Sequence, residues 1–374
     1  MWTSTAPKDL KASFDNAISS AYGNGSNDEL SNLAKLFSDA AMRNYERGLN
    51  NALDEDSAAS VGLAWIDKRP IAKLTADGPG AELGDMLLIV EEFDPQGRVS
   101  TRACIVEVKQ SPSSTIPPVP VTPGSESTKN QFKILSEWPT IHGVRATGSN
   151  NSYLLENVVT QPGPKDGGVL TQAWYAAVRP KSAGAANPYP WMVAPAIRGA
   201  DFNYTLGDLF AACAIKQSLR GPDSRPIGVG REVDLEEVRA QPGWSELIET
   251  IIVVARRYHL PPKYFDNKKT NRYRQTYINA RDHAFLMLAM PAPGSVLNIA
   301  LGTATGIVLA AITLAIAFWL VQVANDARIS ARAARKEIAH QDKSEGDADE
   351  RKFPVIYFSI FHGEKYDQQV FGDG

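Results

Sequence analysis

The sequence contains few cysteines, and the two present, Cys104 and Cys213, have no CxxC spacing. Both fall in apolar stretches that predict a buried strand and a buried helix, so neither a disulfide framework nor a thiolate metal site is expected. The amino terminus lacks a basic start followed by an apolar run, so no secretory signal is predicted. These absences favour a reducing cytosolic compartment.

Signals of several enzyme classes are also missing. The five histidines are scattered without metal-ligand spacing, and no GxSxG, P-loop or GxGxxG motif occurs in its proper context. Serine hydrolases and nucleotide-binding enzymes are therefore poorly supported. The formal net charge is −3, so any affinity for nucleic acid has to come from a local basic patch.

Apolar periodicity predicts alternating helices and strands along the chain. Helices are expected at 29–53, 129–138, 206–219 and 244–258, and strands at 86–92, 101–110, 171–178 and 354–362. The tetrapeptide at 94–97, DPQG, has turn chemistry and joins the first two strands, whereas the Pro- and Ser-rich residues 111–128 predict a surface loop. This order indicates an α/β or α+β fold in which helices flank a mixed sheet.

A long apolar run lies near the C-terminus. No charged side chain occurs from Ala284 to Asn325, and residues 296–323 are long enough to cross a bilayer core of about 30 Å as one helix. Gly302 and Gly306 form a GxxxG pair, through which two such helices would approach closely and make a homo-oligomer. The sequence therefore predicts a transmembrane helix at 296–323, the alternative being a buried helix of a large core.

The charges around this run conflict with a single span. Basic residues at 328–336 favour a cytoplasmic C-terminal flank, whereas a domain without a signal should also remain cytoplasmic. Either the basic residues within 256–281 outweigh the later cluster, or residues 285–323 form a hairpin bent at its prolines, or the run is buried. If the strand at 354–362 belongs to the soluble domain, only the hairpin and the buried run remain.

Three charged residues on the predicted hairpin suggest metal-dependent hydrolysis. Phosphodiester cleavage with a divalent ion needs carboxylates that converge on one point. With Gln96 at the centre of the turn, Asp85 and Glu107 are equally distant from it and face each other on adjacent antiparallel strands. Lys109 follows Glu107 by two positions and shares its face. The alternative is a structural Glu107–Lys109 pair beside a turn aspartate.

The segment GAELGDMLLIVEE, followed by ACIVEVKQ, resembles the motif pair of PD-(D/E)xK nucleases. It is most similar to bacterial, defence-associated members in which ELGD, ExK and a QxxL-xxWP helix occur in this order, here ending in QFKILSEWP. The resemblance covers Val61 to Pro139 and implies a restriction-endonuclease-like fold. It also implies that Asp85 and Glu107 bind Mg²⁺, or Mn²⁺ in its place, that Lys109 positions the attacking water, and that Gln131 lies near the phosphate.

Other acidic residues are less securely assigned. Glu82 lies three positions before Asp85 and is a candidate metal ligand, a residue behind the ligands, or a solvated loop carboxylate. Members of the superfamily often use a carboxylate from the first helix, and Glu29 and Glu46 are both available. The sequence does not choose between them.

A basic stretch rich in aromatic residues bears on the substrate. Such a stretch neutralises phosphates and stacks bases, or else contacts anionic lipid headgroups beside the membrane run. Its cationic residues are Arg256, Arg257, Lys263, Lys268, Lys269, Arg272 and Arg274.

These expectations describe a Mg²⁺-dependent DNA nuclease, with RNA as the other substrate considered, in the bacterial inner membrane. Its catalytic domain would face the cytoplasm and serve in antiviral defence, under an unidentified activator. The alternative is a catalytically silent membrane scaffold or sensor that oligomerises through Gly302 and Gly306. The expected parts are a helical region at 1–58, the nuclease core at 59–145, the rest of the soluble domain at 146–290, the span at 296–323, and a charged linker with a terminal strand at 324–374.

Overall fold

The computed structural model describes two stretches of the chain. They are residues 353–362 and residues 1–257 without 24–28, 67–69, 95–98, 122, 123, 125, 156–168, 181–188, 222–224 and 235–241. All of them belong to one compact unit, formed by residues 1–277 and 350–374. The basic residues from Lys263 to Arg274 and the predicted span at 296–323 lie outside the described residues, as do Gly302 and Gly306.

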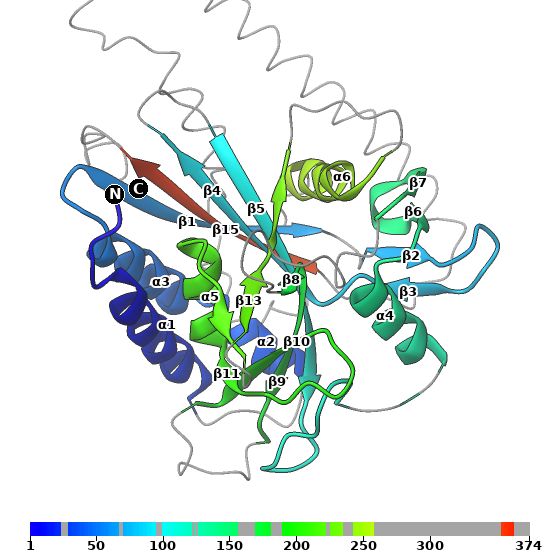
Figure 1. Cartoon of the computed structure of the whole chain (residues 1–374), viewed down its shortest axis with the longest axis horizontal. Helices are drawn as coiled ribbons and strands as arrows, with labels where there is room; N and C mark the ends of the chain where they lie inside the picture. Colours follow the sequence, from blue (N-terminus) through cyan, green and yellow to red (C-terminus); the bar gives the residue numbers. More distant parts are fainter. Residues whose placement is uncertain are drawn as a thin grey trace, which may run out of the picture. The chain divides into compact units, whose positions relative to one another are not determined.

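A mixed sheet of eight strands forms the centre of this unit (Figure 1). The strand order is β1-β15-β4-β5-β9-β10-β11, and β14 also pairs with β5. β15 runs parallel to β4 and antiparallel to β1, and β9 runs parallel to β5. The strands are β1 Ser57–Ile66, β4 Met86–Phe93, β5 Val99–Gln110, β9 Ala173–Val178, β10 Trp191–Pro195, β11 Tyr204–Thr205, β14 Arg231–Val233 and β15 Phe353–His362.

The strands of this sheet are apolar on both faces because helices cover both. Alternate residues of β4, such as Leu88 and Val90, pack with α1 (Ala6–Tyr22), α3 (Asp39–Ala52) and α5 (Leu206–Ala214). The residues between them, such as Leu87 and Ile89, pack in a second core with α4 (Glu126–Glu137) and α6 (Trp244–Arg257). Figure 1 shows α1, α3 and α5 grouped on one side of the sheet. The expectation of a mixed sheet flanked by helices is confirmed.

Two small sheets complete the described fold. One has the order β3-β2-β6-β7 and carries the 3-10 turn η1, and α4 lies against its strand β3. The other has the order β12-β13-β8. Their elements are β2 Ile71–Lys73, β3 Gly80–Glu82, β6 Ile141–Val144, η1 Arg145–Thr147, β7 Ser149–Tyr153, β8 Val169–Thr171, β12 Leu219–Arg220 and β13 Pro226–Val229.

The helix boundaries correct the sequence prediction in two places. The single helix expected at 29–53 is wrong, because α2 (Glu29–Lys35) ends in a turn and Ser38 caps a new helix, α3, through its side chain. The helix expected at 206–219 ends at Ala214, and Lys216 with φ 54 breaks the helical geometry. The amphipathic pattern runs through both breaks, so periodicity alone did not reveal them.

The C-terminal strand lies inside the sheet instead of at its edge. β15 is hydrogen-bonded along its whole length to β1 on one side and over most of it to β4 on the other. The chain therefore leaves this unit after residue 277, re-enters it at residue 350 and supplies a central strand, β15. No helix in the described part of the chain is long and apolar enough to cross a bilayer.

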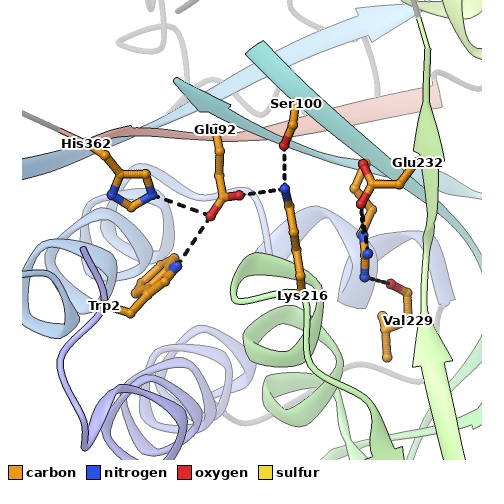
Figure 2. A network of polar contacts seen from close by, with 8 residues as sticks. Trp2, Glu92, Ser100, Lys216, Val229, Glu232 and His362 are labelled. Atoms are coloured by element: carbon orange, nitrogen blue, oxygen red, sulfur yellow. Dashed lines mark hydrogen bonds and ion pairs between the residues drawn. The ribbon is translucent and has the colours of Figure 1, made fainter. Parts of the chain in front are cut away.

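A network of polar contacts around Glu92 links the C-terminal end of β4 to other parts of the fold (Figure 2). Glu92 accepts a hydrogen bond from Trp2 Nε1 at 3.3 Å, lies 2.6 Å from Lys216 Nζ, and lies 3.5 Å from His362 Nε2. Burial alone would raise the pKa of Glu92, but its contacts with His362, Lys216 and Trp2 outweigh this effect and lower it to about 2. The network joins the N-terminal segment, the residues after α5, and β15.

Candidate active site

The pairing of β4 with β5 brings the predicted site residues together. Met86 pairs with Val106 and Phe93 with Val99, so residue 96 is the centre of the register, as the sequence predicts. Asp85 lies directly before the first paired residue of β4, and its N–H donates to the Val106 carbonyl at 2.9 Å. Asp85 therefore enters the sheet beside Glu107.

Gly84 makes this entry possible. Its φ is +113, a conformation that residues with a side chain rarely adopt. A Cβ at this position would lie 2.7 Å from Ile105 Cγ2 and 3.1 Å from the Val106 carbonyl oxygen. Leu83, the residue before it, is fully buried and donates its N–H to the Pro70 carbonyl at 2.9 Å. The glycine of the ELGD motif is therefore required by the structure, because it lets the chain approach β5 closely.

The carboxylate of Asp85 is held by the backbone. Its Oδ2 atom accepts a hydrogen bond from the Val108 N–H at 2.7 Å, and the residue is 8% exposed. Val108 lies between Glu107 and Lys109, so this bond ties Asp85 to the strand that carries both. The aspartate does not merely end a turn.

Glu107 has a partner at each carboxylate oxygen. Lys109 Nζ donates to Oε1, and Gln131 Nε2 donates to Oε2 at 2.7 Å. Glu107 is fully buried, whereas the side chain of Lys109 is 20% exposed. Gln131 reaches the site from α4. The structure therefore brings together the four residues assigned catalytic roles: Asp85, Glu107, Lys109 and Gln131.

The pKa values of both Glu107 and Lys109 are shifted upward at this site. Burial, together with the negative charges of Asp85 and Glu82, raises the pKa of Glu107 well above its ordinary value, although Lys109 opposes the shift. Burial would lower the pKa of Lys109, but the charges of Glu107, Asp85 and Glu29 outweigh it and raise it. Lys109 therefore carries its proton at neutral pH.

The carboxylates suit Mg²⁺ in a site completed by water. Within the described ranges, no three Asp, Glu, His or Cys side chains form a ready metal cluster. Mg²⁺, however, commonly binds one or two protein carboxylates and keeps several waters, and Asp85 with Glu107 supplies this set. Burial first, and the charges of Asp85 and Glu82 after it, raise the pKa of Glu107, and a divalent cation would offset both effects.

The structure shows which of the other acidic candidates lie near the site. Glu29, at the start of α2, accepts a hydrogen bond from the Gln110 N–H at 2.9 Å and acts electrostatically on Lys109. Glu46 instead accepts from the Val61 N–H at 2.9 Å, which ties α3 to β1. Glu82 is half-buried at the end of β3, where its charge raises the pKa of Glu107. Glu29 and Glu82 are thus near the site, whereas Glu46 has a structural bond.

The segment QFKILSEWP, which contains Gln131, packs against one face of the sheet beside the site. Leu135 and Trp138 are fully buried, and Trp138 meets Trp244 of α6 edge-to-face at 5.3 Å between ring centroids. Phe132, next to Gln131, packs against Tyr175 of β9, whose register partner on β5 is Glu107. The sequence did not single out Phe132 or Tyr175, and only the pairing of β5 with β9 places them beside the carboxylates.

The structure describes little of the predicted basic stretch. Arg256 and Arg257 form the last turn of α6, and the other five residues lie outside the described part of the chain. This stretch therefore stays a prediction.

No family model, curated protein or solved structure matches the chain.

Proposed function

We propose that this chain is a Mg²⁺-dependent nuclease of the PD-(D/E)xK type that hydrolyses phosphodiester bonds of DNA. The observation that supports it best is the convergence of Asp85, Glu107, Lys109 and Gln131 from the start of β4, the end of β5 and helix α4. A structural Glu107–Lys109 pair would need neither the bond from the Val108 N–H to the Asp85 carboxylate nor an amide from a separate helix.

The residues divide the chemistry between them. Asp85 and Glu107 would hold the metal ion, which when bound activates water and neutralises charge on the phosphate. Lys109 keeps its proton because carboxylates surround it, so it acts as a cationic donor toward the water or a phosphate oxygen. Gln131 orients Glu107 through its amide N–H. Glu29 holds the end of β5 at Gln110.

The test is cleavage of supercoiled plasmid by the full-length chain in detergent with Mg²⁺. Asp85→Asn and Lys109→Met should each lower the rate by about 100-fold or more, since each removes a charge at the reacting centre. Asp77→Asn is the matched control, because Asp77 is an exposed loop residue. This variant should cleave like the wild type. Circular dichroism checks that the variants fold.

The outcome separates the nuclease from the silent membrane scaffold. Equal cleavage by the wild type and by Asp85→Asn would place any activity elsewhere. A folded wild-type chain that cleaves neither DNA nor RNA would favour the scaffold or sensor, or dependence on an activator.

We further propose that the apolar run enters the bacterial inner membrane as a hairpin, with the catalytic unit in the cytoplasm. Support comes from α6 and β15, which flank the run and belong to one unit. A chain that leaves and re-enters one unit crosses a bilayer an even number of times. Cysteines introduced as His283→Cys and Asp326→Cys should both react with an impermeant maleimide only after the inner membrane is opened. Labelling of one alone in intact spheroplasts would contradict the hairpin.

A further inference from the structure

An exposed arginine stands beside the proposed nuclease site. Arg198 follows β10, and its Cζ atom lies 4.7 Å from the ring centroid of Phe132. Phe132 packs in turn against Tyr175, with 6.3 Å between ring centroids, and Tyr175 neighbours Glu107 in the sheet. Gln131, which donates to Glu107, precedes Phe132 on α4. The guanidinium of Arg198 therefore contacts Phe132, the residue that lies between it and Tyr175.

The backbone around Arg198 is fixed. The Gly199 N–H donates to the Val119 carbonyl at 2.9 Å, and the Val119 N–H donates to the Ala200 carbonyl at 3.0 Å. Val119 belongs to the loop that follows β5, the strand of Glu107. The turn is thus tied to the same part of the fold as the candidate catalytic residues, so the arginine is held at a defined position relative to them.

The charge of Arg198 is available to a ligand. Among the described residues, no carboxylate forms an ion pair with it, and its side chain is exposed. The Phe132 ring supports one face of the planar guanidinium, which leaves the N–H groups at its edge free to donate. A fixed planar fork of donors matches the oxygens of a phosphate.

We propose that Arg198, held by Phe132, binds a backbone phosphate of the DNA substrate outside the scissile position. This inference rests on the proposed nuclease function. A DNA strand presents one phosphate about every 3.4 Å along the helix axis. A strand whose scissile phosphate lies at Glu107 therefore carries further phosphates past Phe132. Arg198 is a positioning residue, because it does not touch the carboxylates.

The experiment compares Arg198→Ala and Arg198→Lys with Arg43→Ala. Arg43 is an exposed arginine on α3, which covers the opposite face of the sheet, so this control removes the same charge. The full-length chain in detergent is titrated against a fluorescent 30-base-pair duplex in EDTA at several salt concentrations. Steady-state cleavage of the same duplex is measured with Mg²⁺.

Arg198→Ala should raise Kd and KM about three- to tenfold, as expected for one phosphate contact, with kcat nearly unchanged. It should also reduce the slope of log Kd against log salt by about 0.9, the contribution of one neutralised phosphate. Arg198→Lys should fall between the wild type and Arg198→Ala, because it keeps the charge and loses the planar fork.

Two other results overturn the proposal in different ways. If the wild type cleaves and Arg198→Ala behaves like Arg43→Ala, the nuclease function stands and the role of Arg198 is refuted. If the wild type neither binds nor cleaves the duplex, the proposed function itself fails.

Discussion

Replacing Gly84 with alanine tests whether the ELGD turn positions Asp85, the proposed metal ligand. A residue with a side chain at φ +113 costs about 1–3 kcal/mol. The added Cβ would also lie 2.7 Å from Ile105 Cγ2 and 3.1 Å from the Val106 carbonyl oxygen, and overpacking of this kind costs about 1–3 kcal/mol more. We therefore expect Gly84→Ala to lower the free energy of unfolding by roughly 4 kcal/mol, near the middle of the summed ranges.

Gly148→Ala separates the steric effect from the backbone effect. Gly148 also has a positive φ, +69, but no atom lies within 4 Å of a Cβ built there. Its substitution should cost only about 1–2 kcal/mol, the penalty of the left-handed conformation. Urea titration followed by tryptophan fluorescence gives both free energies for the full-length chain in detergent.

Plasmid cleavage supplies the second readout, under conditions where both variants are folded. Gly84→Ala should lose cleavage, because β5 cannot yield without moving Asp85 away from the Val108 N–H. Gly148→Ala should keep it. If the unfolding free energy of Gly84→Ala lies within about 1 kcal/mol of that of Gly148→Ala and Gly84→Ala cleaves at the wild-type rate, Gly84 does not position Asp85.

Two further predictions concern pH. The pKa of Glu107 is raised in the folded state, so the protonated carboxyl favours folding. Its stabilising contribution to the free energy of unfolding is complete below about pH 4.5 and is lost as the pH rises through the folded-state pKa. The unfolding free energy of Glu107→Gln relative to wild type should therefore grow as pH rises from 5 to 8, and a pH-independent difference would contradict this. The pKa of Glu92 is lowered to about 2, so its contribution is present above about 4.5 and lost as pH falls toward 2. Allowing for screening by solvent, that contribution to the unfolding free energy is about 1–2 kcal/mol. Between pH 5 and 2 the wild type should lose this amount of stability, and Glu92→Gln should not.

The strand pair at the site could be predicted because its determinants are local. The turn chemistry and the two apolar runs fix both the centre at residue 96 and the pairing of Met86 with Val106. Asp85, directly before Met86, is thereby brought to the strand of Glu107, where its carboxylate accepts a hydrogen bond from the Val108 N–H. Alternation along one strand then places Lys109 on the face of Glu107, and the structure shows their contact.

Features that depend on distant residues were beyond the sequence. The choice between Glu29 and Glu46 depends on where the fold brings their partners, because Glu29 accepts from the Gln110 N–H and Glu46 from the Val61 N–H. Arg198 offers no local signal, since its role comes from packing against Phe132. The order of strands around β15 likewise reflects the whole fold.

The central place of β15 affects how the protein is made. β15 pairs with β4 across about 270 residues of sequence, with Val355 beside Leu87, two positions from Asp85. At about 5–20 residues per second, ribosomes need roughly 15–50 s to travel that distance. During this time β1 and β4 each lack their common neighbour, and such open strand edges invite pairing with other chains. A nascent chain therefore contains the proposed catalytic residues long before it has the sheet that supports them, and translation that stops before residue 353 leaves both edges open.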